Sequence, residues 1–193
     1  FLVFPTRAEQ IGSLQRKKRK YQFTHKNEKA YPGYYAVHFN RPDIHAELTA
    51  TQRTGLHRYT FDSDQSAGIL IDISHAMGDR RSEGAVLQVL EDNRSFQGKV
   101  KTFGTFASRF GGVEVYFAAR FNRPFSQQGI WIDDTYISDQ TFAEADDLTA
   151  AFGFDKTSHV ELRLAISHVS IENAWENLET ETGEKDFDEI ARE

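Results

Sequence analysis

Apolar and polar residues alternate at every second position along most of this chain. In segment 44–51 every even-numbered residue is apolar and every odd-numbered residue is polar, as expected for a strand with one buried face. Segments 113–121 and 160–166 repeat the pattern. Shorter candidate strands lie at 34–39, 56–61, 68–73, 85–90, 129–132 and 148–154. About nine or more short strands of this kind predict a mainly antiparallel β-sandwich.

Turn residues separate these segments. The clearest are Pro32-Gly33, Arg41-Pro42-Asp43, Asp92-Asn93 and Gly111-Gly112. Gly and Asn tolerate the backbone conformations of tight turns, and Pro fixes one of them in advance. These positions therefore support hairpin connections between neighbouring antiparallel strands.

The periodicity changes at Ser170. Apolar residues then recur at Ile171, Ala174, Trp175 and Leu178, which is the spacing of one helix face. The Ser170 hydroxyl is suited to capping the first turn, and Asp186 followed by Glu189 indicates a second, short helix. We therefore expect a β-sandwich domain over residues 1–169 and a helical segment over residues 170–193.

Composition narrows the function classes. The chain has 193 residues, enough for one domain with two full sheets, and it has no 18-residue apolar run that would span a membrane. Its net charge of −6 argues against nucleic-acid binding. The basic run Arg16–Lys20 is either a phosphate-binding patch or a solvated loop, and the acidic chain favours the loop. The absence of cysteine excludes disulfides and thiolate chemistry.

A polar loop containing His25, Asn27 and Glu28 precedes the Pro32-Gly33-Tyr34-Tyr35 turn. Such side chains can hydrogen-bond sugar hydroxyls, and tyrosine rings can stack on a pyranose. Alternatively, the loop bonds its own backbone and the tyrosines pack on the sheet. The residues alone favour the second alternative.

Two further groups are candidates for binding. Arg53, His57 and Arg58 either clamp a carboxylate or form the solvent side of a hairpin, and period-two exposure favours the hairpin. Asp62, Asp64 and the pair Asp133-Asp134 raise the question of calcium. Counted from Asp62, however, an EF-hand would place Ala67 and Ile73 where it needs glycine and a carboxylate. No metal site is predicted.

Catalysis is not located by motif. Glycoside hydrolysis generally needs two suitably spaced carboxylates, and no pair among the 29 acidic residues is marked by its spacing. There is no nucleophile elbow, phosphate-cradling glycine loop or HExxH helix. Catalysis therefore cannot be placed in this chain from its residues alone.

Several segments together resemble glycoside hydrolase family 92, a family of exo-acting α-mannosidases. They are THKNEKA at 24–30, PGYY at 32–35, AELTAT at 46–51, Arg53, Gly55, HRYTF at 57–61 and VYFAA at 115–119. A later block, ISHVSIENA at 166–174 with Asn177-Leu178, Glu181 and Asp186-Phe187-Asp188, is similar to the family's crossing between its first and second domains.

The resemblance implies a two-domain enzyme with an N-terminal super-sandwich and a larger (α/α)6 barrel. It implies calcium dependence and inversion at the anomeric carbon, with the calcium site and catalytic carboxylates mainly in the helical domain. By this pattern the sandwich at 1–169 is N-terminally incomplete and 170–193 leads toward an absent barrel. The start FLVFPT, without Met, indicates a cut inside a longer protein or a processed end.

These considerations give a leading hypothesis and two alternatives. The first is the N-terminal sandwich of a secreted or periplasmic α-mannosidase, inactive alone, that shapes one side of the mannose pocket through His25, Asn27 and Glu28. Its partners are then mannose-containing glycans and the helical domain. The alternatives are a non-catalytic carbohydrate-binding sandwich and a purely structural or protein-interaction sandwich.

Overall fold

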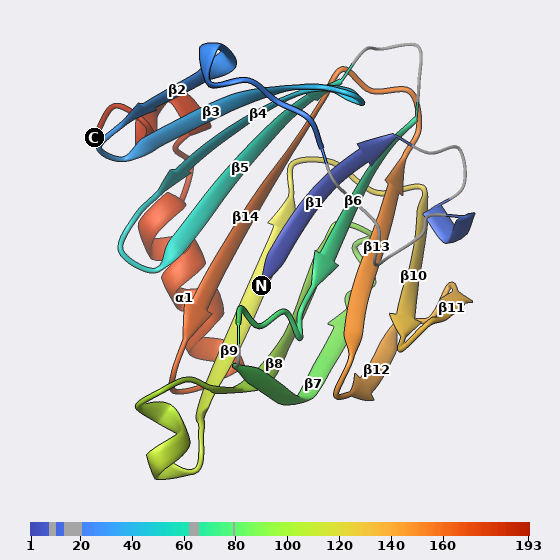
Figure 1. The fold of residues 1–193 in the computed structure, drawn as a ribbon, viewed down its shortest axis with the longest axis vertical. Coiled ribbons are helices and arrows are strands. Elements are labelled where there is room, and N and C mark those ends of the chain that lie inside the picture. The colour runs from blue at the N-terminus through green and yellow to red at the C-terminus, as the bar shows by residue number, and fades with distance from the viewer. Residues whose placement is uncertain (8–10, 14–20, 62–65, 79) are drawn as a thin grey trace.

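The computed structural model describes residues 1–7, 11–13, 21–61, 66–78 and 80–193. Within them the chain forms fourteen strands in two antiparallel sheets, with two short α-helices at the C-terminal end (Figure 1). The predicted fold class, a mainly β antiparallel sandwich with short C-terminal helices, is therefore confirmed.

The smaller sheet has five strands. Their spatial order is β1 (Leu2–Arg7), β6 (Ala67–Asp72), β13 (Leu148–Phe154), β10 (Gln127–Ile132) and β11 (Thr135–Ser138). The larger sheet has nine, in the order β12 (Phe142–Ala145), β7 (Arg81–Val89), β8 (Ser95–Phe103), β9 (Val113–Phe121), β14 (His159–Ser167), β5 (Thr54–Phe61), β4 (Asp43–Ala50), β3 (Tyr34–Asn40) and β2 (Glu28–Tyr31).

Every predicted strand segment overlaps an observed strand. Agreement is close at 148–154, and the prediction at 85–90 misses the first residues of β7. The predictions did not include β1, β2, β8, β11 and β12. Three short 3-10 helices, η1 (Ile11–Ser13), η2 (His25–Asn27) and η3 (Ala107–Phe110), interrupt the connections.

The core lies between the two sheets and is rich in phenylalanine. Phe96 of the larger sheet stacks on Phe152 of the smaller one, with ring centroids 4.8 Å apart. Phe121 meets the same Phe152 ring edge-on at 5.2 Å. All three side chains are buried, and aromatic pairs in these geometries add to the stabilisation from burial itself. The alternating apolar residues of β9 and β14 contribute to the same core.

The alternation of β4 is only partly reflected in its burial. Ile44 and Ala46 are buried as predicted, but Ala50 is exposed and Thr49 is buried from the opposite face. Thr49 donates a hydrogen bond from Oγ1 to the carbonyl of Gly33, 2.8 Å away. Gly33 has a φ of 82°, which glycine tolerates better than other residues. This conformation lets the β2–β3 turn bring the Gly33 carbonyl to the Thr49 hydroxyl.

The helices α1 (Ile171–Thr182) and α2 (Phe187–Ile190) pack on the outer face of the larger sheet. The Ser170 side chain caps α1 by accepting from Asn173, and Asp186 and Glu189 form a reciprocal capping box on α2, as predicted. Ala174 and Leu178 are buried against the sheet. No helix in the described parts of the chain is long and apolar enough to cross a membrane.

Candidate functional site

The predicted loop residues lie at the free edge of the larger sheet. His25 and Asn27 belong to η2, and Glu28 begins the edge strand β2. The Glu28 carboxylate accepts a hydrogen bond from Tyr35 Oη at 2.6 Å and is paired with His25 Nδ1. Asn27 donates from its side-chain amide to Asn40 Oδ1, 3.2 Å away. The structure thus joins His25 to Glu28 and ties Asn27 separately to the end of β3.

These contacts set the charge state of the loop. The hydrogen bond from Tyr35, and then that from His25, holds the pKa of Glu28 below its ordinary value. Burial and the same hydrogen bond raise the pKa of Tyr35 to about 12. Glu28 is therefore an anionic acceptor, while the side chain of His25 is 92% exposed and faces solvent. The loop is suited to accepting hydroxyl hydrogen bonds.

Arg53, His57 and Arg58, for which a carboxylate clamp was the less favoured alternative, do not converge on one site, because adjacent strand residues point to opposite faces. Arg53 reaches α1, where its Nε lies 2.8 Å from Glu181 Oε1. Arg58 lies on the outer face, and His57 lies on the inner face. Arg53 and Arg58 do bind carboxylates, but those carboxylates belong to this chain.

Arg58 is the centre of a network that sequence reasoning missed. It donates two hydrogen bonds to Glu47, at 2.8 and 2.9 Å, and one to Asp188 of α2 at 2.9 Å. Tyr34 donates to the same Glu47 at 2.7 Å, and the Arg58 guanidinium lies 4.3 Å from the Phe187 ring. Hydrogen bonds from Arg58 hold the pKa of Glu47 below its ordinary value. A signal was available, since the β4–β5 hairpin pairs Glu47 directly with Arg58.

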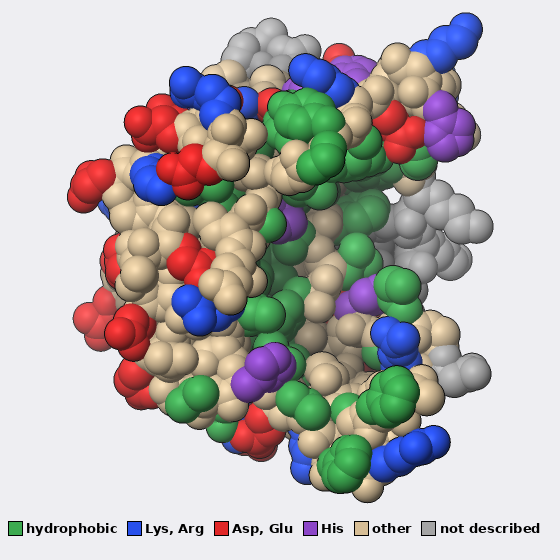
Figure 2. All heavy atoms as spheres, turned by 90° about the vertical axis from the view of Figure 1, so that its left-hand side faces the viewer, with side chains coloured by type: hydrophobic (Ala, Val, Ile, Leu, Met, Phe, Trp, Pro, Cys, Tyr) green, Lys and Arg blue, Asp and Glu red, His purple; other side chains and the backbone are tan. Residues whose placement is uncertain are grey.

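A groove opens on the inner side of the β4–β5 hairpin. Its volume is about 500 Å³, and its walls come from segments 1–3 and 50–55 together with His57, Leu164 and Ile166. Figure 2 looks onto this side of the molecule and shows hydrophobic side chains along the hollow. His57 Nδ1 lies 2.8 Å from Tyr59 Oη, and burial lowers the pKa of His57 to about 4. The groove is therefore largely apolar, with a neutral imidazole in its wall.

The carboxyl groups with clearly shifted pKa values are poorly suited to general acid catalysis. An acid catalyst needs a raised pKa so that it is still protonated near neutral pH. Every carboxyl group with a clearly shifted pKa in the described residues is shifted downward. These groups are held by donors within the chain and serve its packing.

The described residues also contain no group of three His, Asp or Glu side chains placed to hold a metal ion. Asp133 and Asp134 form the β10–β11 turn, where the Asp133 amide donates to the carbonyl of Asp147 at 3.1 Å. Asp62, Asp64 and the basic run Arg16–Lys20 lie outside the described residues.

Comparison with known families identifies the fold and its relatives. The glycosyl hydrolase family 92 N-terminal domain matches residues 1–167. The chain belongs to glycosyl hydrolase family 92. A search of curated protein sequences finds no match.

Solved structures of family members superimpose on most of this chain. The GH92 inverting mannosidase BT2199 from Bacteroides thetaiotaomicron superimposes over 98% of this chain with a TM-score of 0.84 and 25% identity. The GH92 α-mannosidase BT3965 from the same organism covers 99% at a TM-score of 0.85 and 23% identity. The GH92 glycosyl hydrolase ccman5 covers 89% at 0.78 and 27%. This chain spans only 24%, 27% and 24% of those three chains, respectively.

Proposed function

We propose that this chain is the N-terminal sandwich of a calcium-dependent, inverting exo-α-mannosidase, secreted or periplasmic, and that it forms one wall of the mannose pocket. The supporting observation is the family match over residues 1–167, together with the GH92 inverting mannosidase that superimposes over 98% of the chain. Under this proposal residues 1–169 are the domain, and 170–193 lead toward an (α/α)6 barrel.

Under this proposal the catalytic groups belong to the rest of that polypeptide. One carboxylic acid must protonate the leaving oxygen while a carboxylate activates water on the opposite face of the sugar. Glu28 and Glu47 are anionic and already hydrogen-bonded within the sandwich. We assign to Glu28, with His25 and Asn27 beside it, the role of accepting sugar hydroxyls or contacts from the helical domain. Calcium would be held by the helical domain.

Turnover of an aryl α-mannoside tests the proposal. When it is supplied with calcium, the complete protein is expected to release mannose first as the β-anomer. Proton NMR monitors which anomer is released. The 193-residue chain alone is expected to release none. Hydrolysis by the chain alone, or retention of configuration by the complete protein, would contradict the proposal.

The groove beside His57 favours one alternative, a carbohydrate-binding module without catalysis. The two functions differ in what the isolated chain does. A half-pocket gives no heat when titrated with mannose or mannobiose, whereas an autonomous module binds them. Binding that His57→Ala abolishes, with the fold intact by circular dichroism, would establish the module in place of the pocket wall.

A further inference from the structure

The loop between β8 and β9 contains hydrogen bonds within its own backbone. Within it, Ser108 donates through its amide to the carbonyl of Gly104 at 2.9 Å, and Gly112 donates to Ala107 at 2.8 Å. Gly112 has a φ of 90°, and a Cβ atom there would lie 2.9 Å from the Phe103 ring. Glycine suits this position because other residues rarely adopt such a φ.

This ordered loop presents two phenylalanines to solvent. Phe106 is 75% exposed and Phe110 is 84% exposed, the two highest values among the large hydrophobic residues that the structure describes. Phe106 precedes η3 and Phe110 is its last residue, and η3 projects from the end of the sandwich (Figure 1). Exposed apolar side chains that cluster on a projecting loop mark interaction sites. The fold holds these rings outward without any packing role for them.

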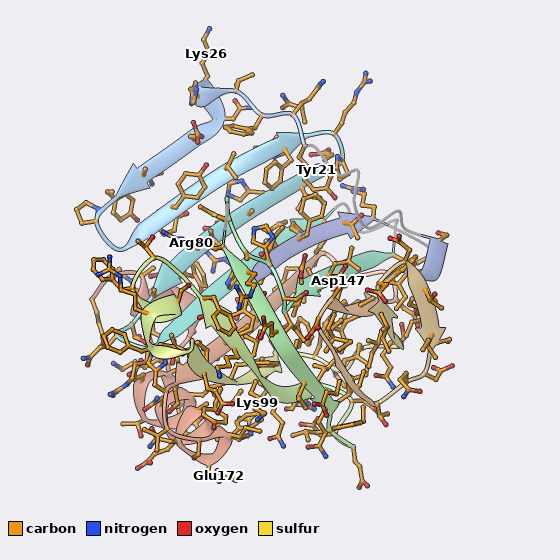
Figure 3. All side chains as sticks on the ribbon, turned by 60° about the horizontal axis from the view of Figure 1, so that its bottom comes forward. Tyr21, Lys26, Arg80, Lys99, Asp147 and Glu172 are labelled. Atoms are coloured by element: carbon orange, nitrogen blue, oxygen red, sulfur yellow. The ribbon has the colours of Figure 1, made fainter. Side chains whose placement is uncertain are left out.

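Basic side chains lie on the same loop and at its base. Arg109 lies 5.9 Å from the Phe106 ring, and Arg81 and Lys101 lie over Phe103 at the base of the loop. Arg80 leads into β7 at the same end of the sheet (Figure 3). Figure 2 shows hydrophobic and basic side chains together at this end of the molecule.

Among the described residues these cations have two acidic neighbours, Glu83 and Glu114, the second lying opposite Lys101 in the β8–β9 register. Glu83 pairs with Arg81 at 2.7 Å. No carboxylate of the described residues lies within ion-pair distance of Arg80, Lys101 or Arg109. We name the set Arg80, Arg81, Lys101, Phe106, Arg109 and Phe110 the aromatic-basic tip. It is a positive, apolar surface on a chain whose net charge is −6.

We propose that the aromatic-basic tip is a docking surface for the rest of the family polypeptide. The occupant would be a surface with an apolar pocket for Phe106 and Phe110 and carboxylates at its rim. Two observations support this occupant: the chain spans only about a quarter of its structural relatives, and the cations at the tip complement an acidic rim. The inference rests on the proposed function, because that function supplies the remaining polypeptide.

Hydrogen exchange of residues 104–112, followed by mass spectrometry, tests the tip directly. In the complete protein this loop is expected to exchange at least tenfold more slowly than in the isolated chain. The double variant Phe106→Ser/Phe110→Ser should abolish that protection and lower the melting temperature of the complete protein. The urea midpoint of the isolated chain should not change, because both rings are solvent-exposed there.

Phe142 supplies a matched control. It is 52% exposed on the edge strand β12, and Phe142→Ser should leave the protection of the tip unchanged. Equal exchange rates in the chain and the complete protein would overturn the docking proposal, even if α-mannoside turnover confirms the proposed function. Protection without turnover would instead contradict the function alone. Co-sedimentation of the complete protein with phosphatidylglycerol vesicles, lost in the double variant, would assign the tip to a lipid surface and also overturn docking.

Discussion

At the residue scale, Arg58 connects a strand of the larger sheet to a C-terminal helix. It links Glu47 of β4 to Asp188 of α2 and covers the Phe187 ring. Replacing Arg58 by Ala leaves the Glu47 carboxylate, only 13% exposed, without its two-point partner. We expect the free energy of unfolding in urea to fall by about 2 to 3 kcal/mol, because an uncompensated, largely buried charge is costly.

The exposed pair Arg81–Glu83 is the comparison for this prediction. Its side chains are 65% and 45% exposed, so Arg81→Ala should change stability by less than about 0.5 kcal/mol. Arg58→Lys should fall between the two, since lysine keeps the charge but not the fork-shaped contact. An unchanged urea midpoint for Arg58→Ala would show that the network contributes little.

His57 should make stability depend on pH. Its pKa is lowered to about 4 by burial, whereas an unfolded histidine titrates near 6.5. Below about pH 6.5 the unfolded chain therefore takes up a proton that the folded chain refuses, and stability decreases until the pH reaches about 4. The expected loss is on the order of 2 kcal/mol, reduced by partial solvent access to the groove.

The variant His57→Gln checks the pH prediction, because it removes the titrating ring. Its urea stability should vary less between pH 6.5 and 4.5 than that of the unmodified chain. His25→Gln, at a side chain that is 92% exposed, is the control. If both variants keep the original slope, another group causes the pH dependence.

At the scale of elements, α1 behaves as part of the sandwich. Trp175 donates from Nε1 to Gln97 of β8 at 2.6 Å, and Asn177 donates to the carbonyl of Ile166 at 2.9 Å. Leu178 is 1% exposed. We propose that residues 171–190 unfold together with the β domain, although the family match ends at residue 167.

Leu178→Ala tests this unit. A cavity at a buried leucine costs about 2 to 4 kcal/mol. That loss should appear in a single unfolding transition, seen alike in helical circular dichroism and in tryptophan fluorescence. The more exposed Glu176→Ala should have little effect. If the variant melts the helix while the sheet unfolds at its original midpoint, the helices are a separate linker.

Element prediction succeeded where side-chain alternation is strong and failed where it is weak. Strand β8 was missed because Gly98 carries no side chain and its neighbours include Gln97, Lys99 and Lys101. The structure gives the reason for that glycine: a Cβ atom there would lie 1.9 Å from the carbonyl oxygen of Val86. Close approach of two strands therefore removed the apolar residue that would have revealed the pattern.

At the scale of the whole molecule, sequence patterns indicated two sheets. They did not indicate which side chains meet on each face of a sheet. Arg58 and Asp188 meet although they are 130 residues apart. Their contact depends on α2 folding back over the larger sheet, and periodicity carries no information on that. The loop of His25, Asn27 and Glu28 was found because its polar residues are adjacent in sequence. The residues of the aromatic-basic tip come from separate segments of the chain, and only the fold brings them together.

The proposed calcium dependence can be tested by comparing the isolated chain with the complete protein. A ligand that binds only the folded state raises the melting temperature by mass action. The described residues offer no three-ligand group, so millimolar calcium or a chelator should shift the melting temperature of the isolated chain by less than about 1 °C. The complete protein is expected to lose mannosidase activity on chelation and regain it with calcium.

Two double variants locate any calcium effect that does appear in the isolated chain. Asp133→Asn/Asp134→Asn alters the β10–β11 turn, and Asp62→Asn/Asp64→Asn alters the other acidic pair. A calcium-dependent rise in melting temperature, removed by either variant, would place a metal site inside the sandwich and contradict its assignment to the helical domain. With no rise, the proposed assignment of calcium to the helical domain is retained.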